Sequence, residues 1–82
     1  MKTPRYYKGN ALAHIGKYDE AIQAYDEVIG QDPNYTRARI GKGLSLAYQK
    51  EYDEAIKALD KAIEINPQDE AAWAGKGIDL LI

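Results

Sequence analysis

The sequence repeats itself with a period of 34 residues, the offset from Ala21 to Ala55. The segment Tyr18–Ile22 returns unchanged as Tyr52–Ile56. The dipeptide Lys-Gly recurs three times in the same register, ending at Gly9, Gly43 and Gly77. A period of this length is typical of proteins built from stacked copies of one helical unit, each packed against its neighbours. We therefore expect a short helical array and not a compact enzyme domain.

Start and stop signals divide each copy into two helices. Thr3-Pro4 is typical of a helix start, because the hydroxyl caps free N–H groups and proline at the first helical position loses no hydrogen bond. Asp19 and Glu20 place negative charge in a first turn, where the helix dipole favours it. Pro33 cannot continue a helix. We predict an all-α fold with five helices, at about 3–14, 19–30, 36–49, 53–65 and 69–82.

Composition narrows the class of protein. The chain has 82 residues, 45% of them hydrophobic, and 11 basic against 13 acidic side chains give a net charge of −2. This balance lacks the basic surface that nucleic-acid binding requires, and no apolar run approaches the roughly 20 residues that span a bilayer. The absence of cysteine fits a reducing compartment. We expect one cytoplasmic domain, residues 1–82, with neither a nucleic-acid nor a membrane partner.

The repeated residues resemble the tetratricopeptide repeat family. The resemblance lies in Ala21-x3-Tyr25 with Pro33, in Ala55-x3-Leu59 with Pro67, and in Trp73-x2-Lys76-Gly77-x2-Leu80, and it covers nearly the whole chain. It implies an α-solenoid of antiparallel helix hairpins, with repeat one at about 3–35, repeat two at about 36–69 and a terminal helix at about 70–82. It also implies close helix contacts at the small residues Gly9, Ala21, Gly43, Ala55 and Gly77.

Two sets of residues depart from the family pattern. Lysine precedes the glycines at positions 8, 42 and 76, where the family usually has leucine. Arg5 and Arg39 stand where Trp73 stands in the third unit. Both kinds of side chain lay their methylene stems along apolar surface while the charge stays in water, so we expect the fold to tolerate them.

No residue pattern supports catalysis. His14 is the single histidine, and without cysteine it has no partners for a zinc site. The recurrence of Asp-Glu at 19–20 and 53–54 points to helix starts and not to general acid–base chemistry. Gly41-Lys42-Gly43 lacks the further glycine and the hydroxyl residue of a P-loop. We predict that the protein is not an enzyme and holds no metal or cofactor.

The resemblance implies a function in protein or peptide binding. In the family, the first helix of each hairpin lines a concave groove that holds a peptide. Here the groove would be lined by Tyr6, Tyr7, Asn10, His14, Arg37, Ile40, Leu44, Tyr48 and Ile78, with Thr3, Ala13, Gly41, Ala47, Ala71, Ala74 and Gly75 between them. This surface is largely apolar, so an apolar or aromatic segment suits it. A simpler interpretation of the tyrosines is that they pack between helices and bind nothing.

Some family members clamp the carboxylate at the C-terminus of a peptide. Only Asn10 matches that clamp, because Tyr6, Gly41, Ala71 and Gly75 occupy the places of its other polar residues. We therefore do not expect a carboxylate clamp. Arg37, Arg39 and Lys42 on one helix form a solvated face or, as the alternative, face an acidic partner.

The last helix suggests an alternative function. Repeat arrays generally need a polar outer face at their ends, but this sequence finishes in apolar residues. Self-association would then use Trp73, Leu80, Leu81 and Ile82. In that interpretation two copies form a homodimer, with or without exchange of helices, or the sequence is a truncated or engineered fragment of a longer array.

Overall fold

Five α-helices form the chain in the computed structural model, which describes the backbone of residues 4–81 and the side chains of residues 4–77. They are α1 (Arg5–His14), α2 (Tyr18–Gln31), α3 (Thr36–Tyr48), α4 (Tyr52–Ile65) and α5 (Glu70–Leu81). Each lies within about two residues of its predicted range, and the all-α prediction is confirmed. None of these helices, over the described residues, has the length and apolarity needed to cross a membrane.

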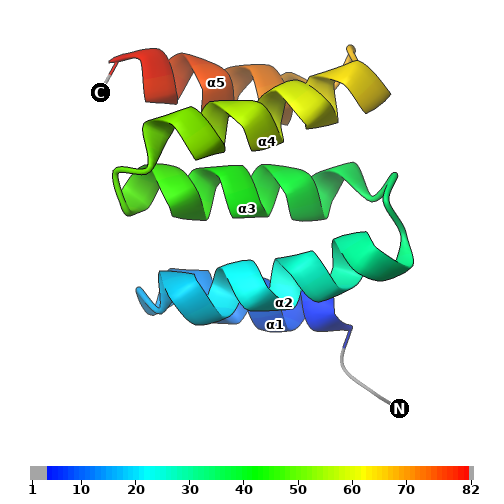
Figure 1. The fold of residues 1–82 in the computed structure, drawn as a ribbon, viewed down its shortest axis with the longest axis vertical. Coiled ribbons are helices and arrows are strands. Elements are labelled where there is room, and N and C mark those ends of the chain that lie inside the picture. The colour runs from blue at the N-terminus through cyan, green and yellow to red at the C-terminus, as the bar shows by residue number, and fades with distance from the viewer. Residues whose placement is uncertain (1–3, 82) are drawn as a thin grey trace.

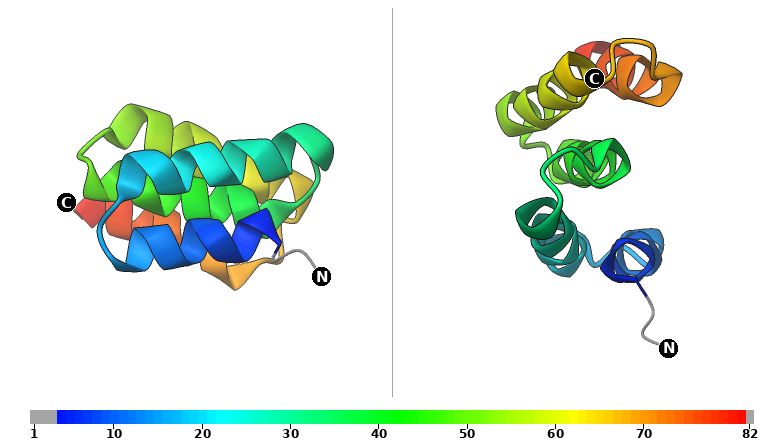
Figure 2. Two further views of the ribbon diagram at one scale, coloured as in Figure 1. Left: turned by 90° about the horizontal axis from the view of Figure 1, so that it is seen from below. Right: turned by 90° about the vertical axis from the view of Figure 1, so that its right-hand side faces the viewer.

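The helices stack along one axis as antiparallel neighbours, with α1 and α5 at opposite ends (Figure 1). The side view in Figure 2 shows α1, α3 and α5 in one layer and α2 and α4 in the other, and the stack bends into an arc. The molecule measures 38 × 25 × 17 Å. The first helices of successive hairpins also contact one another, α1 with α3 and α3 with α5. This layer is the concave side of the arc.

Two side chains on the second helices fill the space between the hairpins. A Cβ atom at Gly9 would lie 2.7 Å from the ring of Tyr25, and one at Gly41 would lie 2.5 Å from the same ring. Tyr25 on α2 is therefore held between a glycine of its own hairpin and a glycine of the next. Leu59 on α4 repeats this arrangement 34 positions later, 2.8 Å and 3.1 Å from the corresponding Cβ positions of Gly43 and Gly75.

The predicted close contacts are confirmed at four of the five small residues. Gly9 and Gly43 are buried, and Ala21 and Ala55 are completely inaccessible to solvent. The prediction is wrong for Gly77, because no atom of the described residues lies within 4 Å of a Cβ built there. The equivalent glycines contact a side chain from the helix that follows them, and α5 is the last helix of the described residues.

The start of α1 differs from the prediction. Pro4 is the N-cap and not the first helical residue, and its carbonyl oxygen accepts hydrogen bonds from the amides of Tyr7 and Lys8 at 3.0 and 3.2 Å. The predicted cap, Thr3, lies outside the described residues.

The tight turns inside the two hairpins share a left-handed residue. Gly16 has φ +84° and Lys50, its equivalent, has φ +66°. Glycine adopts this conformation without steric cost, whereas a lysine pays for the contact of its Cβ atom with the backbone. The turn geometry is therefore imposed by the hairpin, since the second repeat keeps it with an unfavourable residue.

The residues that depart from the family pattern make contacts that recur between hairpins. Lys42 pairs with Asp26, and Lys76 pairs with Asp60, each at 2.7 Å between Nζ and Oδ1. These pairs tie each hairpin to the next one, although partly exposed pairs contribute only about 0–1 kcal/mol each. The lysine side chains at positions 42 and 76 are 32% and 29% exposed, so their charges remain at the surface while they pair.

Arginine and tryptophan perform the same task at equivalent positions. Arg39 Nε donates a hydrogen bond of 2.9 Å to the carbonyl of Pro33, and Trp73 Nε1 donates one of 2.8 Å to the carbonyl of Pro67. Both bonds fix the loop between hairpins to the helix that follows. Arg5, the first residue of α1, has no preceding hairpin loop to bond and pairs instead with Glu27 at 2.6 Å. A planar N–H donor is the shared requirement at positions 39 and 73.

The glycines around Tyr25 make a testable prediction. We expect Gly41→Ala to lower the free energy of unfolding by about 1–2 kcal/mol, because overpacking costs roughly 1–3 kcal/mol and helix propensity returns at most about 1 kcal/mol. Gly30→Ala is the matched control, since no atom lies within 4 Å of its Cβ position. Urea unfolding followed by circular dichroism measures both. Equal stability of the two variants would show that Tyr25 does not need the glycine.

Candidate functional site

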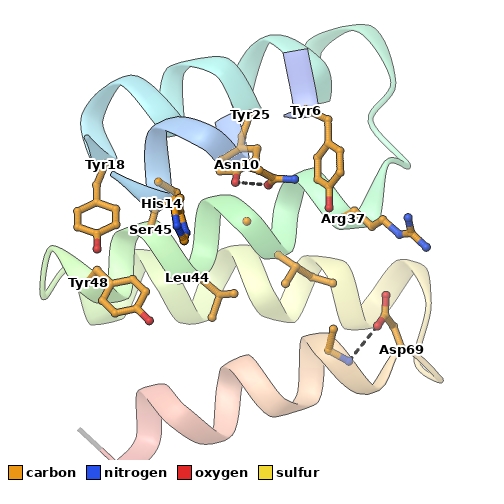
Figure 3. A pocket seen from close by; sticks show the side chains of 14 residues that line it. Tyr6, Asn10, His14, Tyr18, Tyr25, Arg37, Leu44, Ser45, Tyr48 and Asp69 are labelled. Carbon is orange, nitrogen blue, oxygen red and sulfur yellow. Dashed lines mark hydrogen bonds between the residues drawn. The ribbon is translucent and has the colours of Figure 1, made fainter. Parts of the chain in front are cut away.

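A groove of about 710 Å³ opens on the layer formed by α1, α3 and α5 (Figure 3). It is lined by Tyr6, Asn10, Ala13, His14, Tyr18, Tyr25, Arg37, Ile40, Gly41, Leu44, Ser45, Tyr48, Asp69 and Ala71. The structure thus brings seven of the nine principal residues of the predicted groove around one cavity: Tyr6, Asn10, His14, Arg37, Ile40, Leu44 and Tyr48.

The remaining predicted residues lie elsewhere. Tyr7 is 57% exposed and does not line the groove, because adjacent residues on a helix point about 100° apart and Tyr6 takes the inward direction. Among the smaller residues, Ala47, Ala74 and Gly75 are not part of the lining. Thr3 and the side chain of Ile78 lie outside the described residues.

Four lining residues were missed by the sequence analysis: Tyr18, Tyr25, Ser45 and Asp69. The hairpin geometry contains a signal for two of them. The start of α2 lies beside the end of α1 in an antiparallel pair, which places Tyr18 near His14. Since α3 and α5 run in the same direction, the residue before α5 lies beside the start of α3, which places Asp69 near Arg37.

The groove combines apolar, aromatic and polar side chains, and it is more polar than the largely apolar surface that the sequence predicts. Tyrosine supplies four of its side chains, and five others carry amide, imidazole, guanidinium, hydroxyl or carboxylate groups. The apolar prediction came from the first helices alone. Helix α2 adds Tyr18 and Tyr25, and the residue directly before α5 adds the carboxylate of Asp69.

Tyr25 connects the packing of the hairpins to the groove. Its side chain is 2% exposed, and its hydroxyl donates a hydrogen bond of 2.6 Å to Oδ1 of Asn10. Burial, with a smaller contribution from the neighbouring Tyr6 hydroxyl, raises the pKa of Tyr25 to about 12. The ring of Tyr6 lies 6.2 Å from that of Tyr25 between centroids. The orientation of the Asn10 amide is therefore fixed by a buried donor.

In the second repeat, two leucines occupy the positions equivalent to Tyr25 and Asn10. Positions 25 and 10 correspond to Leu59 and Leu44, and Leu44 packs against the core cluster that contains Leu59. The same backbone site therefore holds either a hydrogen-bonded pair or two aliphatic side chains.

A stacked pair of tyrosines closes one end of the groove. The rings of Tyr18 and Tyr48 are 5.2 Å apart between centroids and 9° from parallel. Beside them, Gln49 Nε2 donates a hydrogen bond of 2.5 Å to Asp19 Oδ1, which ties the end of α3 to the start of α2. Tyr48 is nevertheless 69% exposed. Its ring is held against Tyr18 and is still accessible to solvent; Figure 3 shows the two side chains at this end of the groove.

Opposite charges lie at the other end of the groove. Asp69 Oδ1 accepts a hydrogen bond of 3.0 Å from the amide of Ala71 and so caps α5. Arg37 projects from the first turn of α3, and within the described residues no carboxylate lies within ion-pair distance of its guanidinium. The carboxylate of Asp69 is therefore bonded within the protein, whereas the guanidinium of Arg37 has no ion-pair partner among the described residues.

The residues expected to mediate self-association are only partly described. Trp73 is 52% exposed, and Lys76 Nζ lies 5.9 Å from its ring centroid. The side chains of Leu80, Leu81 and Ile82 lie outside the described residues. Among the side chains that the structure describes, no group of three or more His, Cys, Asp and Glu residues is placed to hold a metal ion.

The raised pKa of Tyr25 predicts a loss of stability in alkali. Because the folded pKa of about 12 exceeds the ordinary value of about 10, stability is complete below pH 10 and falls as pH rises towards 12. Tyr25→Phe removes this titration and also one hydrogen bond worth about 1 kcal/mol. We expect the wild type to be more stable at pH 8 and the difference to shrink above pH 10, measured by urea unfolding. A difference independent of pH would contradict this prediction.

Comparison with known proteins agrees with this geometry. The model of a tetratricopeptide repeat family matches residues 6–70. A solved structure described as the second TPR of Spaghetti (RPAP3) bound to HSP90 peptide SRMEEVD superposes with a TM-score of 0.89 at 25% sequence identity, covering 94% of this chain and 71% of that one. No curated protein sequence matches. Since the family model spans most of the sequence, the chain belongs to the tetratricopeptide repeat family.

Proposed function

We propose that this protein is a non-catalytic interaction module that binds a peptide or protein segment in the groove on its concave side. The similar solved structure holds a peptide, which supports the class of partner. The observation that carries the proposal is Tyr48, an exposed aromatic ring held against Tyr18 inside a groove of about 710 Å³. A ring that is already ordered contributes contact area with little further loss of entropy on binding.

The groove also has a donor for a peptide backbone. Because Oδ1 of Asn10 accepts the hydrogen bond of Tyr25, the amide nitrogen of Asn10 is left to donate to a bound carbonyl. A buried peptide group needs such a partner, since an unpaired one costs about 1–3 kcal/mol. Tyr25 thereby acts on binding through the orientation of Asn10.

The proposal does not include capture of a C-terminal carboxylate by the clamp described above. Of the residues at the clamp positions, Tyr6, Gly41 and Ala71 line the groove and offer no cation. Asn10 is the remaining match, and its carbonyl oxygen is already bonded to Tyr25. A free chain end is therefore not required of the partner.

Self-association through α5 is the second candidate. It is favoured by the exposed ring of Trp73 and by the Cβ position of Gly77, which no described residue fills although Gly77 is equivalent to the buried Gly9 and Gly43. Sedimentation equilibrium over a wide range of protein concentration tests it. A monomer at all concentrations would eliminate this candidate and leave peptide binding unaffected.

Peptide binding is tested with a random library of blocked decapeptides, followed by titration of the selected binders. We expect Tyr48→Ala to weaken these binders at least about fivefold, because truncating an aromatic anchor costs more than about 1 kcal/mol. Tyr7→Ala is the matched control, since Tyr7 is comparably exposed but lies outside the groove lining. We expect it to change affinity less than twofold.

A library that yields no binders would refute the proposal. Binders that are equally affected by the two substitutions would place the binding surface outside the groove. Circular dichroism of both variants checks that they remain folded.

A further inference from the structure

We infer that the groove recognises an extended segment with a carboxylate side chain at one end and an aromatic or large apolar side chain about five residues away. This inference rests on the proposed function and names the chemistry of its partner. It is carried by Arg37 at one end of the groove, by Tyr48 at the other, and by the helix that fixes the separation between them.

Arg37 is the one cation among the described residues that lines the groove; Lys8, Lys17 and Lys50 also have no ion-pair partner there, but they lie outside the lining. Ion pairs engage Arg5, Lys42, Lys57, Lys61 and Lys76, and the carbonyl of Pro33 engages Arg39. Arg37 lines the groove and has no such partner among the described residues. A guanidinium offers a planar fork of N–H donors that matches a carboxylate in geometry and charge. A carboxylate on the bound segment is therefore its complementary group.

Asp69 lies at the same end of the groove but does not reverse this preference. Its carboxylate accepts the amide hydrogen of Ala71 and sits at the start of α5, where the helix dipole stabilises negative charge. The amide of Ala71 and the positive end of the helix dipole already offset the charge of Asp69, whereas the guanidinium of Arg37 has no such partner among the described residues. The two charges lie on different helices, so a segment is free to contact the α3 side.

The opposite end of the groove suits a ring or a large aliphatic side chain. One face of Tyr48 is covered by the stacked ring of Tyr18, and the side chain remains 69% exposed. His14 lies at the same end, as Figure 3 shows. Offset stacking or an aliphatic contact on the open face buries apolar area without reordering Tyr48. The hydrogen bond from Gln49 to Asp19 braces this end.

Helix geometry sets the distance between the two ends. Arg37 and Tyr48 lie in the first and last turns of α3, eleven residues apart in the sequence. At 1.5 Å per residue their Cα atoms are about 16 Å apart along the helix. An extended chain advances about 3.3 Å per residue, so about five residues bridge that span.

The inference is tested with blocked hexapeptides titrated into the full chain and followed by ¹⁵N NMR. The reference probes carry glutamate and phenylalanine at opposite ends, in both orders, with glycine and serine between them. Glutamine or lysine replaces glutamate in the first comparison probes, and a two-residue separation replaces the five-residue one in the second. Of the two glutamate probes, we take the one whose residue order gives the tighter binding. We expect it to bind about two- to fivefold more tightly than the same peptide with glutamine, the range for an exposed ion pair.

Protein variants assign that difference to a residue. Arg37→Gln should abolish the preference for glutamate over glutamine, and Tyr48→Ala should weaken both probes. Lys8→Gln removes the same charge from an exposed position outside the groove lining and should leave the preference intact. Thermal melts confirm that each variant is folded.

Three results would overturn the inference: equal affinity for glutamate and glutamine probes, tighter binding of the lysine probe, or undiminished binding at the two-residue separation. If the hexapeptides fail while library binders still depend on Tyr48, this inference is wrong and the proposed function stands. If groove resonances instead change with protein concentration alone, the occupant is a second copy of the chain and the inference is wrong.

Discussion

The fit of one side chain between two glycines holds this array together. Tyr25 enters the space between Gly9 and Gly41, and Leu59 enters the equivalent space beside Gly43. Because any Cβ atom at these glycines would collide with the ring or the branched chain, the distance between neighbouring helices is set by the absence of a side chain. The curvature of the stack and the width of the groove follow from that spacing, since α1, α3 and α5 are held apart by the same two residues.

Tyr25 also links the packing of the hairpins to the geometry of the groove. Its ring packs between the hairpins and its hydroxyl orients Asn10 in the groove, whereas Leu59 in the second repeat performs the packing role alone. The array therefore has one polar and one apolar version of the same site. A polar atom placed this deep must be bonded, and Asn10 supplies the acceptor.

The 34-residue period separates framework from groove. The framework recurs in register: the glycines, the buried alanines, and the pairs formed by Lys42 and Lys76 with their aspartates. The groove does not, since Tyr6 corresponds to Ile40 and His14 corresponds to Tyr48. Positions that hold hairpins together face the same neighbours in every repeat. Positions in the groove are free of that constraint and differ from repeat to repeat, and this is why the groove has chemically distinct ends.

The sequence by itself determined the helices, their order and the close contacts at Gly9 and Gly43, because start signals, prolines and the period are all read along the chain. It also identified most of the groove from the first helices of the hairpins. Only the tertiary structure decided that Tyr6 and not Tyr7 faces inward, that Tyr18 stacks on Tyr48, and that no described residue fills the Cβ position of Gly77. These outcomes depend on the rotation and crossing of helices, which a linear pattern does not specify. Contacts between residues thirty positions apart are fixed when the hairpins stack.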